Sequence, residues 1–283
     1  MNKKALIVAL GLILSACVTT PDSRPEPFLK SEALLRDGLN AYQNDNFAEA
    51  QQKFNRALEL YQSFDNQKGV TLSQLNLLET ALAMSDFASA ESYLKLLKQQ
   101  VASNNLEENL KRKIILQESK LQFEQQHYQA ALVTLQPLLA EIDKEKKPDE
   151  MQLNLLAMQA RLEVLVSPLT KSTGLSRFET ALTQTEPQPQ YQVMLKRISA
   201  MIAAKRGEYQ TATTLLKEAL AYYQEQANRR SIAACLEELA ELEMAQQHRK
   251  EAREYLNKAL VIRQWLKNDY KSNQIKKRLT TIK

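Results

Sequence analysis

Small side chains recur about every forty residues along the chain, and apolar residues follow each of them at fixed distances. The small residues are Ala50, Ala90, Ala131, Gly174, Ala212 and Ala252. A large apolar residue follows each one four positions later, and Ala or Leu follows seven positions later. Steps of three and four place these residues on one face of a helix. The pattern therefore predicts helices that cross one another closely at the small residues.

Two segments interrupt this pattern. Pro168 precedes a Ser-Thr-Gly run, and residues 186–189 read Glu-Pro-Gln-Pro. Proline disfavours helix at its own position and at the residue before it. Between these segments only Gly174, Phe178 and Ala181 keep the spacing. The sequence leaves open whether residues 160–185 form a true repeat.

The composition supports a helical chain. Only 5 Gly and 8 Pro occur among 283 residues. Ala, Leu, Gln, Glu and Lys, which are good helix formers, dominate the sequence, and the β-branched and aromatic residues typical of strands are sparse. We therefore predict an all-α protein.

Residues 46–58, NFAEAQQKFNRAL, resemble the second half of a tetratricopeptide repeat, a helix hairpin of about 34 residues. The resemblance implies a right-handed α-solenoid of five to six hairpins over residues 31–267. The period here is longer, which indicates longer helices. Residues 268–283 place Tyr270, Ile275, Leu279 and Ile282 among basic and polar residues, and we predict a basic capping helix there.

The amino terminus has the layout of a secretory signal. Lys3 and Lys4 precede ten uncharged residues, a run too short to span a bilayer, and small residues precede Cys17. Leu-Ser-Ala-Cys resembles the box cut by the bacterial lipoprotein signal peptidase. That resemblance implies a signal peptide over 1–16 and a Cys17 that carries diacylglycerol and an acyl group. Val18, in place of Asp, favours the periplasmic face of the outer membrane. Residues 17–30 contain three prolines, and we expect a tether.

Positive charge gathers at the carboxyl end. From residue 246 onward there are eleven basic and three acidic residues. We predict a basic surface that includes Lys271, Lys276, Lys277 and Arg278. It is either a solvated face of the last helices or a contact for an anionic lipid or glycan.

No catalytic constellation is found in the sequence. His127 and His248 fall in turns three repeats apart, and Cys235 lies in an apolar helical stretch typical of a core cysteine. The sequence has no phosphate-binding loop, no nucleophile elbow and no metal-spaced Cys/His set. We therefore predict a protein that is not an enzyme and has no cofactor or metal. An enzyme of unrecognised type is the weakest alternative.

Repeat arrays bind partners on a concave surface lined by their first helices. The resemblance places groove residues at about positions 2, 5, 9, 12 and 13 of each repeat. The fifth and ninth positions of the fourth repeat are Gln159 and Glu163. The Lys and Asn that hold a terminal carboxylate in some family members are absent there. An early apolar stretch that includes Leu39, Leu75 and Leu116 is either groove or core. The partner-binding candidates are Glu79, Lys120, Phe123, Glu163, Arg197 and Glu241.

Taken together, the chain resembles tetratricopeptide-repeat lipoproteins of the bacterial outer membrane. The expected function is scaffolding or assembly of an envelope complex through protein or peptide partners, without nucleic acid. Outer-membrane protein insertion, pilus or secretion-system assembly and regulation of peptidoglycan synthases all remain open. The main alternative is an envelope surface binder whose basic carboxyl-terminal segment docks on anionic lipid or glycan.

Overall fold

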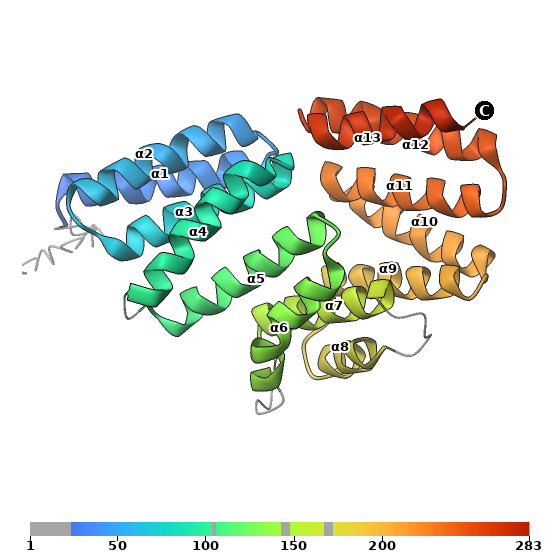
Figure 1. Cartoon of the computed structure of the whole chain (residues 1–283), viewed down its shortest axis with the longest axis horizontal. Helices are drawn as coiled ribbons and strands as arrows, with labels where there is room; N and C mark the ends of the chain where they lie inside the picture. Colours follow the sequence, from blue (N-terminus) through green and yellow to red (C-terminus); the bar gives the residue numbers. More distant parts are fainter. Residues whose placement is uncertain (1–23, 104–105, 143–147, 167–171, 283) are drawn as a thin grey trace, which may run out of the picture.

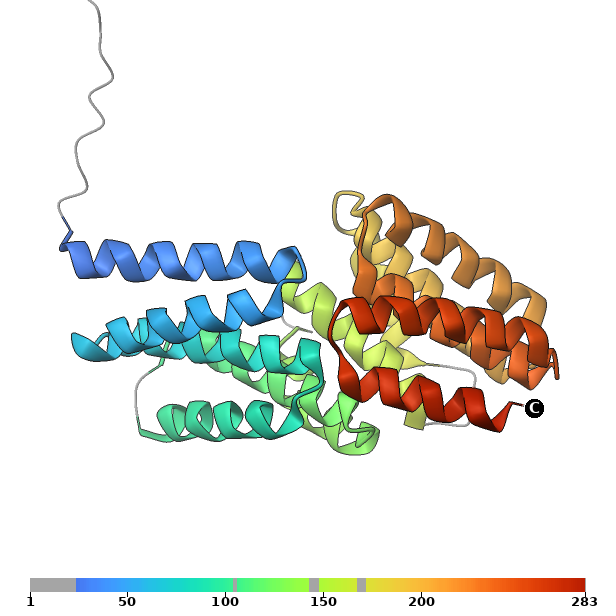
Figure 2. The ribbon, with the colours of Figure 1, turned by 90° about the horizontal axis from the view of Figure 1, so that it is seen from above.

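The computed structural model describes residues 24–103, 106–142, 148–166 and 172–282. Within these ranges the chain forms helices and no strand. Six consecutive hairpins are followed by a single helix (Figures 1 and 2). Their helices are α1 (Glu26–Gln43), α2 (Phe47–Ser63), α3 (Gln67–Met84), α4 (Phe87–Ser103), α5 (Glu108–Glu124), α6 (Tyr128–Ile142), α7 (Glu150–Val166), α8 (Thr173–Thr183), α9 (Pro189–Lys205), α10 (Tyr209–Glu225), α11 (Arg229–Ala245), α12 (Arg249–Trp265) and α13 (Asp269–Thr281).

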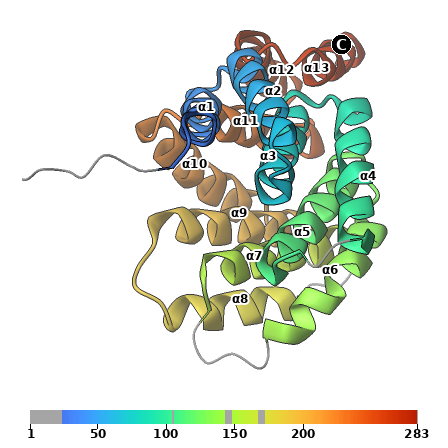
Figure 3. The same cartoon turned by 90° about the vertical axis from the view of Figure 1, so that its left-hand side faces the viewer.

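Each hairpin packs on the next, and the stack curves into a superhelix. Its last hairpin comes to lie beside its first (Figure 3). Helices α5, α7, α9 and α11, the first helices of four successive hairpins, line a hollow inside the curve. The prediction of an all-α solenoid of helix hairpins is confirmed.

The residues that set the repeat spacing form the core. All six small residues of the pattern are buried, and so are the large residues four positions after them. A side chain at Gly174 would collide with the backbone nitrogen of Ala160, 2.8 Å from the added carbon. Gly38 is equally constrained by the ring of Phe54. Small residues therefore stand where the two helices of a hairpin cross, as the pattern predicts.

Most tight turns share a residue in the left-handed conformation, and several also share a side-chain cap at the start of the next helix. One residue in each turn takes the left-handed conformation, for example Asp45, Ser85 and Gln126. Several helices then begin at an Asn or Ser whose side chain accepts a backbone N–H three residues on. These caps are Asn46, Asn66, Ser172, Asn228 and Asn268. Caps of this kind satisfy donors that a helix start would otherwise leave unpaired.

The predicted tether is shorter at its carboxyl end than expected. The first helix begins at Glu26, inside the range 17–30, and Arg24 pairs with Glu32 at 2.6 Å. Pro27 does not prevent this, because proline is tolerated in the first turn of a helix. The ring of Phe28 packs against Tyr61 and Phe64, which fixes the helix start on α2. The predicted signal peptide and Cys17 lie outside the described residues.

No helix in the described part of the chain is both long enough and apolar enough to cross a bilayer.

Candidate functional site

The hollow contains a pocket with about 600 Å³ of empty space that is open to solvent. Its walls come from four helices. The lining residues are Leu116 and Lys120 on α5, Asn154, Ala157, Met158 and Arg161 on α7, Met194, Arg197, Ile198 and Met201 on α9, and Glu238 on α11. Because these four helices belong to successive hairpins, no single repeat could form the pocket.

A carboxylate shared by two arginines forms the polar part of the pocket. Glu238 accepts two hydrogen bonds from Arg197, from Nε at 3.2 Å and from a terminal nitrogen. Arg161 approaches the same carboxylate less closely, with its Nη2 3.7 Å from Oε1. The guanidinium of Arg161 also lies over the ring of Phe123, 4.4 Å from the centroid. One negative charge is thus shared between two positive ones.

The pKa values of the two arginines move in opposite directions. Burial disfavours the charged form of Arg197, but the charge and hydrogen bonds of Glu238 outweigh this and raise its pKa. Burial and the neighbouring Arg197 lower the pKa of Arg161, and the carboxylates of Glu238 and Glu124 oppose this effect without outweighing it. The positive charge of the Arg161 guanidinium is therefore compensated only in part by its surroundings. An added anion at this point would be favourable.

Apart from Lys120 and Asn154, the rest of the pocket lining is apolar. Met158, Met194 and Met201 face it beside Leu116 and Ile198. Methionine side chains are flexible and polarizable, so they adapt to partners of different shape. The pocket can therefore hold an apolar group next to an acidic one.

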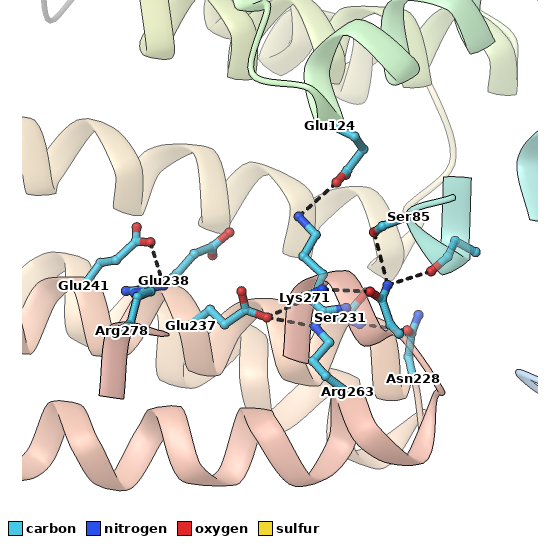
Figure 4. A network of polar contacts seen from close by, with 12 residues as sticks. Ser85, Glu124, Asn228, Ser231, Glu237, Glu238, Glu241, Arg263, Lys271 and Arg278 are labelled. Carbon is cyan, nitrogen blue, oxygen red and sulfur yellow. Dashed lines mark hydrogen bonds and ion pairs between the residues drawn. The ribbon is translucent and has the colours of Figure 1, made fainter. Parts of the chain in front are cut away.

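The structure brings together three of the six predicted groove residues. Lys120 and Arg197 line the pocket, and Phe123 lies beneath Arg161. Glu241 lies one turn after Glu238 on α11 and pairs with Arg278 at 3.4 Å (Figure 4). The Glu241 side chain is 65% exposed, so this pair is largely solvated.

The other two predicted groove residues lie elsewhere. Glu163 accepts hydrogen bonds from Ser172 Oγ and the Gly174 N–H, both at 2.8 Å, so it holds the start of α8. Glu79 lies near the phenol of Tyr42, whose pKa burial raises and Glu79 raises further. Of the early apolar candidates, Leu75 and Leu116 are buried, whereas Leu39 is exposed.

Sequence reasoning missed Arg161 and Glu238. In the third hairpin Ser119 donates to the carbonyl of Ala131, twelve positions later. In the fourth, Gly174 faces Ala160, fourteen positions earlier. The fourth hairpin therefore has two more residues between its crossing points than the third. The groove positions of α7 move back by two residues, so Ala157 and Arg161 face the hollow in place of Gln159 and Glu163. In the sequence, the break in the repeat pattern at Pro168 and the following Ser-Thr-Gly run is the signal that could have indicated this shift.

The predicted basic surface divides between two faces of α13. Lys271 pairs with Glu124 at 3.0 Å and Arg278 pairs with Glu241, so both reach across to other helices (Figure 4). Lys276 and Lys277 are exposed. Arg263 on α12 is buried and pairs with Glu237 at 2.8 Å. Acidic residues of other helices therefore pair with three of the eleven carboxyl-terminal basic residues, including two of the four predicted for the basic surface.

No group of three His, Cys, Asp or Glu side chains in the described ranges is arranged to hold a metal ion. Cys235 is buried, and burial raises the pKa of its thiol to about 11. His248 lies at the start of α12, where Nδ1 is 2.8 Å from a Glu243 carboxylate oxygen. These groups do not form a reactive centre together.

Comparison with solved structures identifies the fold. The apo form of RapI aligns over 89% of this chain and 70% of that chain, with a TM-score of 0.54 and 15% sequence identity. The chain has a helical-repeat fold similar to that of RapI. No protein-family profile and no curated protein sequence matches it. At this identity the likeness shows the fold, and function must be argued from the hollow itself.

Proposed function

We propose that this chain is a non-catalytic scaffold that binds a segment of a protein partner in its hollow, and that the segment carries an acidic group beside apolar side chains. The observation that carries this proposal is the partly compensated Arg161, next to three methionines in a pocket built by four helices. Charge complementarity selects an anion at Arg161, and the apolar wall selects its neighbours.

The cellular setting is part of the proposal. The amino-terminal motif supports a lipid anchor at Cys17 and a position on the periplasmic face of the outer membrane. There the array would assemble or regulate an envelope complex, in outer-membrane protein insertion, pilus or secretion assembly, or peptidoglycan synthesis. The alternative of a basic surface that docks on lipid or glycan has less support, because Lys271 and Arg278 are already paired.

Peptide display on the immobilised protein tests the binding site. We expect selected peptides to combine Asp or Glu with Leu, Met or Phe. The substitution Arg161→Gln should then weaken binding by about tenfold, the equivalent of roughly one charge-assisted hydrogen bond. Lys277→Gln, on the exposed face of α13, is the matched control and should leave affinity unchanged. Selection of peptides without acids, or equal binding by both variants, would show that the hollow is not this site.

A further inference from the structure

The first and second hairpins contact the end of the chain directly. Tyr42 and Arg230 are 188 positions apart, yet they form a hydrogen bond. We define the seam as two sets of contacts between side chains and turns. In the first set, Tyr42, Asp45 and Phe47 meet Arg229 and Arg230; in the second, Ala83, Ser85 and Phe87 meet Asn268 and Tyr270.

The first set is centred on Asp45, whose side chain is only 6% exposed. Arg230 Nε lies 3.1 Å from Asp45 Oδ1, and Arg229 Nη1 lies 3.5 Å from Oδ2. Arg230 also donates to Tyr42 Oη at 2.7 Å and lies over the Tyr42 and Phe47 rings. Both arginines stand at the start of α11, where the helix dipole disfavours cations. Asp45 compensates for that position.

The second set is centred on Asn268. Its Nδ2 donates to the carbonyl of Ala83 at 3.0 Å and to Ser85 Oγ at 3.2 Å. The same residue caps α13 through its side-chain oxygen. Next to it the rings of Tyr270 and Phe87 meet edge to face, with centroids 5.0 Å apart. The start of α13 is therefore tied to the second hairpin.

The seam differs from the interfaces within the stack. Neighbouring hairpins share clusters of buried apolar side chains, but none of the clusters formed by the described residues joins the first two hairpins to the last one. The seam consists of polar contacts and ring contacts at turns. Burial of apolar area is the main stabilising term in folding, so the seam is the interface that separates first.

We propose that the seam is a latch that opens while the hairpins remain folded, and that its opening widens the hollow for a partner segment. The effect of this opening on partner binding rests on the proposed function. Helix α13 links the two features, because Lys271 holds Glu124 on α5 and Arg278 holds Glu241 on α11. Residues 271 and 278 are two turns apart on one face of α13. Separation at Asn268 would therefore also release the contact with α5.

The single tryptophan of the chain reports the state of the latch without a label. Arg229, which pairs with Asp45, lies over the Trp265 ring with its guanidinium carbon 4.1 Å from the centroid. We expect Asp45→Asn to raise the acrylamide quenching constant of Trp265 in the full chain. Asn is compatible with the left-handed backbone of residue 45, where φ is 61°. Added salt should raise quenching in the unmodified protein and have less effect in the variant.

Asp65→Asn is the matched control, because Asp65 has the same left-handed conformation in the turn between α2 and α3. It should leave Trp265 quenching unchanged. Hydrogen exchange read by mass spectrometry completes the test: in Asp45→Asn, exchange should speed up at residues 229–232 and stay unchanged within α2. Unchanged quenching and exchange in Asp45→Asn would overturn the latch. Exchange that speeds up throughout α1 and α2 would also overturn it, since the hairpin itself would then be unfolding. Neither measurement uses a ligand, so the outcome is independent of the peptide test.

Discussion

Single side chains in this protein act across large distances in the sequence. Glu238 connects α11 to α9 through Arg197 and approaches Arg161 on α7. These side chains are partly buried, so removing one member leaves a charge only partly solvated, at a cost below the roughly 3–5 kcal/mol of a fully buried pair. Glu238 therefore has two effects: it holds three repeats together, and it leaves part of the charge of Arg161 available.

Cys235 provides a pH-dependent test of burial at the scale of one residue. Its thiol pKa rises from 9.0 to about 11 through burial, with a smaller opposing effect of Arg197. The folded state therefore favours the neutral thiol. The resulting stabilisation is complete below pH 9 and is lost as the pH rises towards 11. In Cys235→Ala this contribution is absent. We expect the difference in unfolding free energy between the two proteins to shrink by roughly 2–3 kcal/mol over that range.

Urea unfolding at pH 8 and at pH 11 measures this difference. A difference that stays constant between the two values would show that the thiol is equally easy to ionise in both states, and that the burial argument fails.

At the scale of the element, α8 shows how one side chain fixes the position of a short helix. It has eleven residues, fewer than any other helix of the described chain. Isolated helices of this length are marginal in water. Ser172 caps its start, and the carboxylate of Glu163 accepts from both Ser172 and the Gly174 N–H. A negative charge at a helix start is also favourable with the dipole.

Glu163→Gln removes that charge while keeping the shape of the side chain. We expect a loss of about 1–2 kcal/mol in stability, with faster hydrogen exchange concentrated in residues 173–183. Peptide affinity in the hollow should not change, because Glu163 faces α8. Glu179→Gln, on the exposed face of the same helix, is the control and should leave exchange as it is. If Glu163→Gln instead abolished peptide binding and left α8 intact, the assignment of Glu163 to the groove would be restored.

At the scale of the whole molecule, curvature creates the features that no repeat has alone. Six hairpins bring α5, α7, α9 and α11 around one pocket and bring Asp45 to Arg230. Three of the eleven carboxyl-terminal basic residues, Arg263, Lys271 and Arg278, pair inside this assembly with Glu237, Glu124 and Glu241. An anchored array of this form would present its hollow close to the membrane surface.

The anchor is tested by Cys17→Ser. We expect this variant to remain an unprocessed precursor without lipid, while the array keeps its helical circular dichroism and its thermal transition, since α1 begins at Glu26, nine residues after Cys17. Metabolic labelling with palmitate and separation of inner and outer membranes provide the measurement. Incorporation of label into the variant, or outer-membrane fractionation equal to the unmodified protein, would show that Cys17 is not the attachment site.

The sequence by itself determined the helical hairpins, because small and large apolar residues at steps of three and four report which face of each helix is buried. It also located Lys120, Phe123 and Arg197, which obey the regular repeat spacing. It could not place Arg161, because two extra residues between the crossing points of α7 and α8 change the register, and only the contact of Gly174 with Ala160 reveals this. Nor could it pair Asp45 with Arg230 or Lys271 with Glu124. Those partners meet only because the small rotations between successive hairpins add up around the superhelix. No local sequence pattern encodes this total rotation.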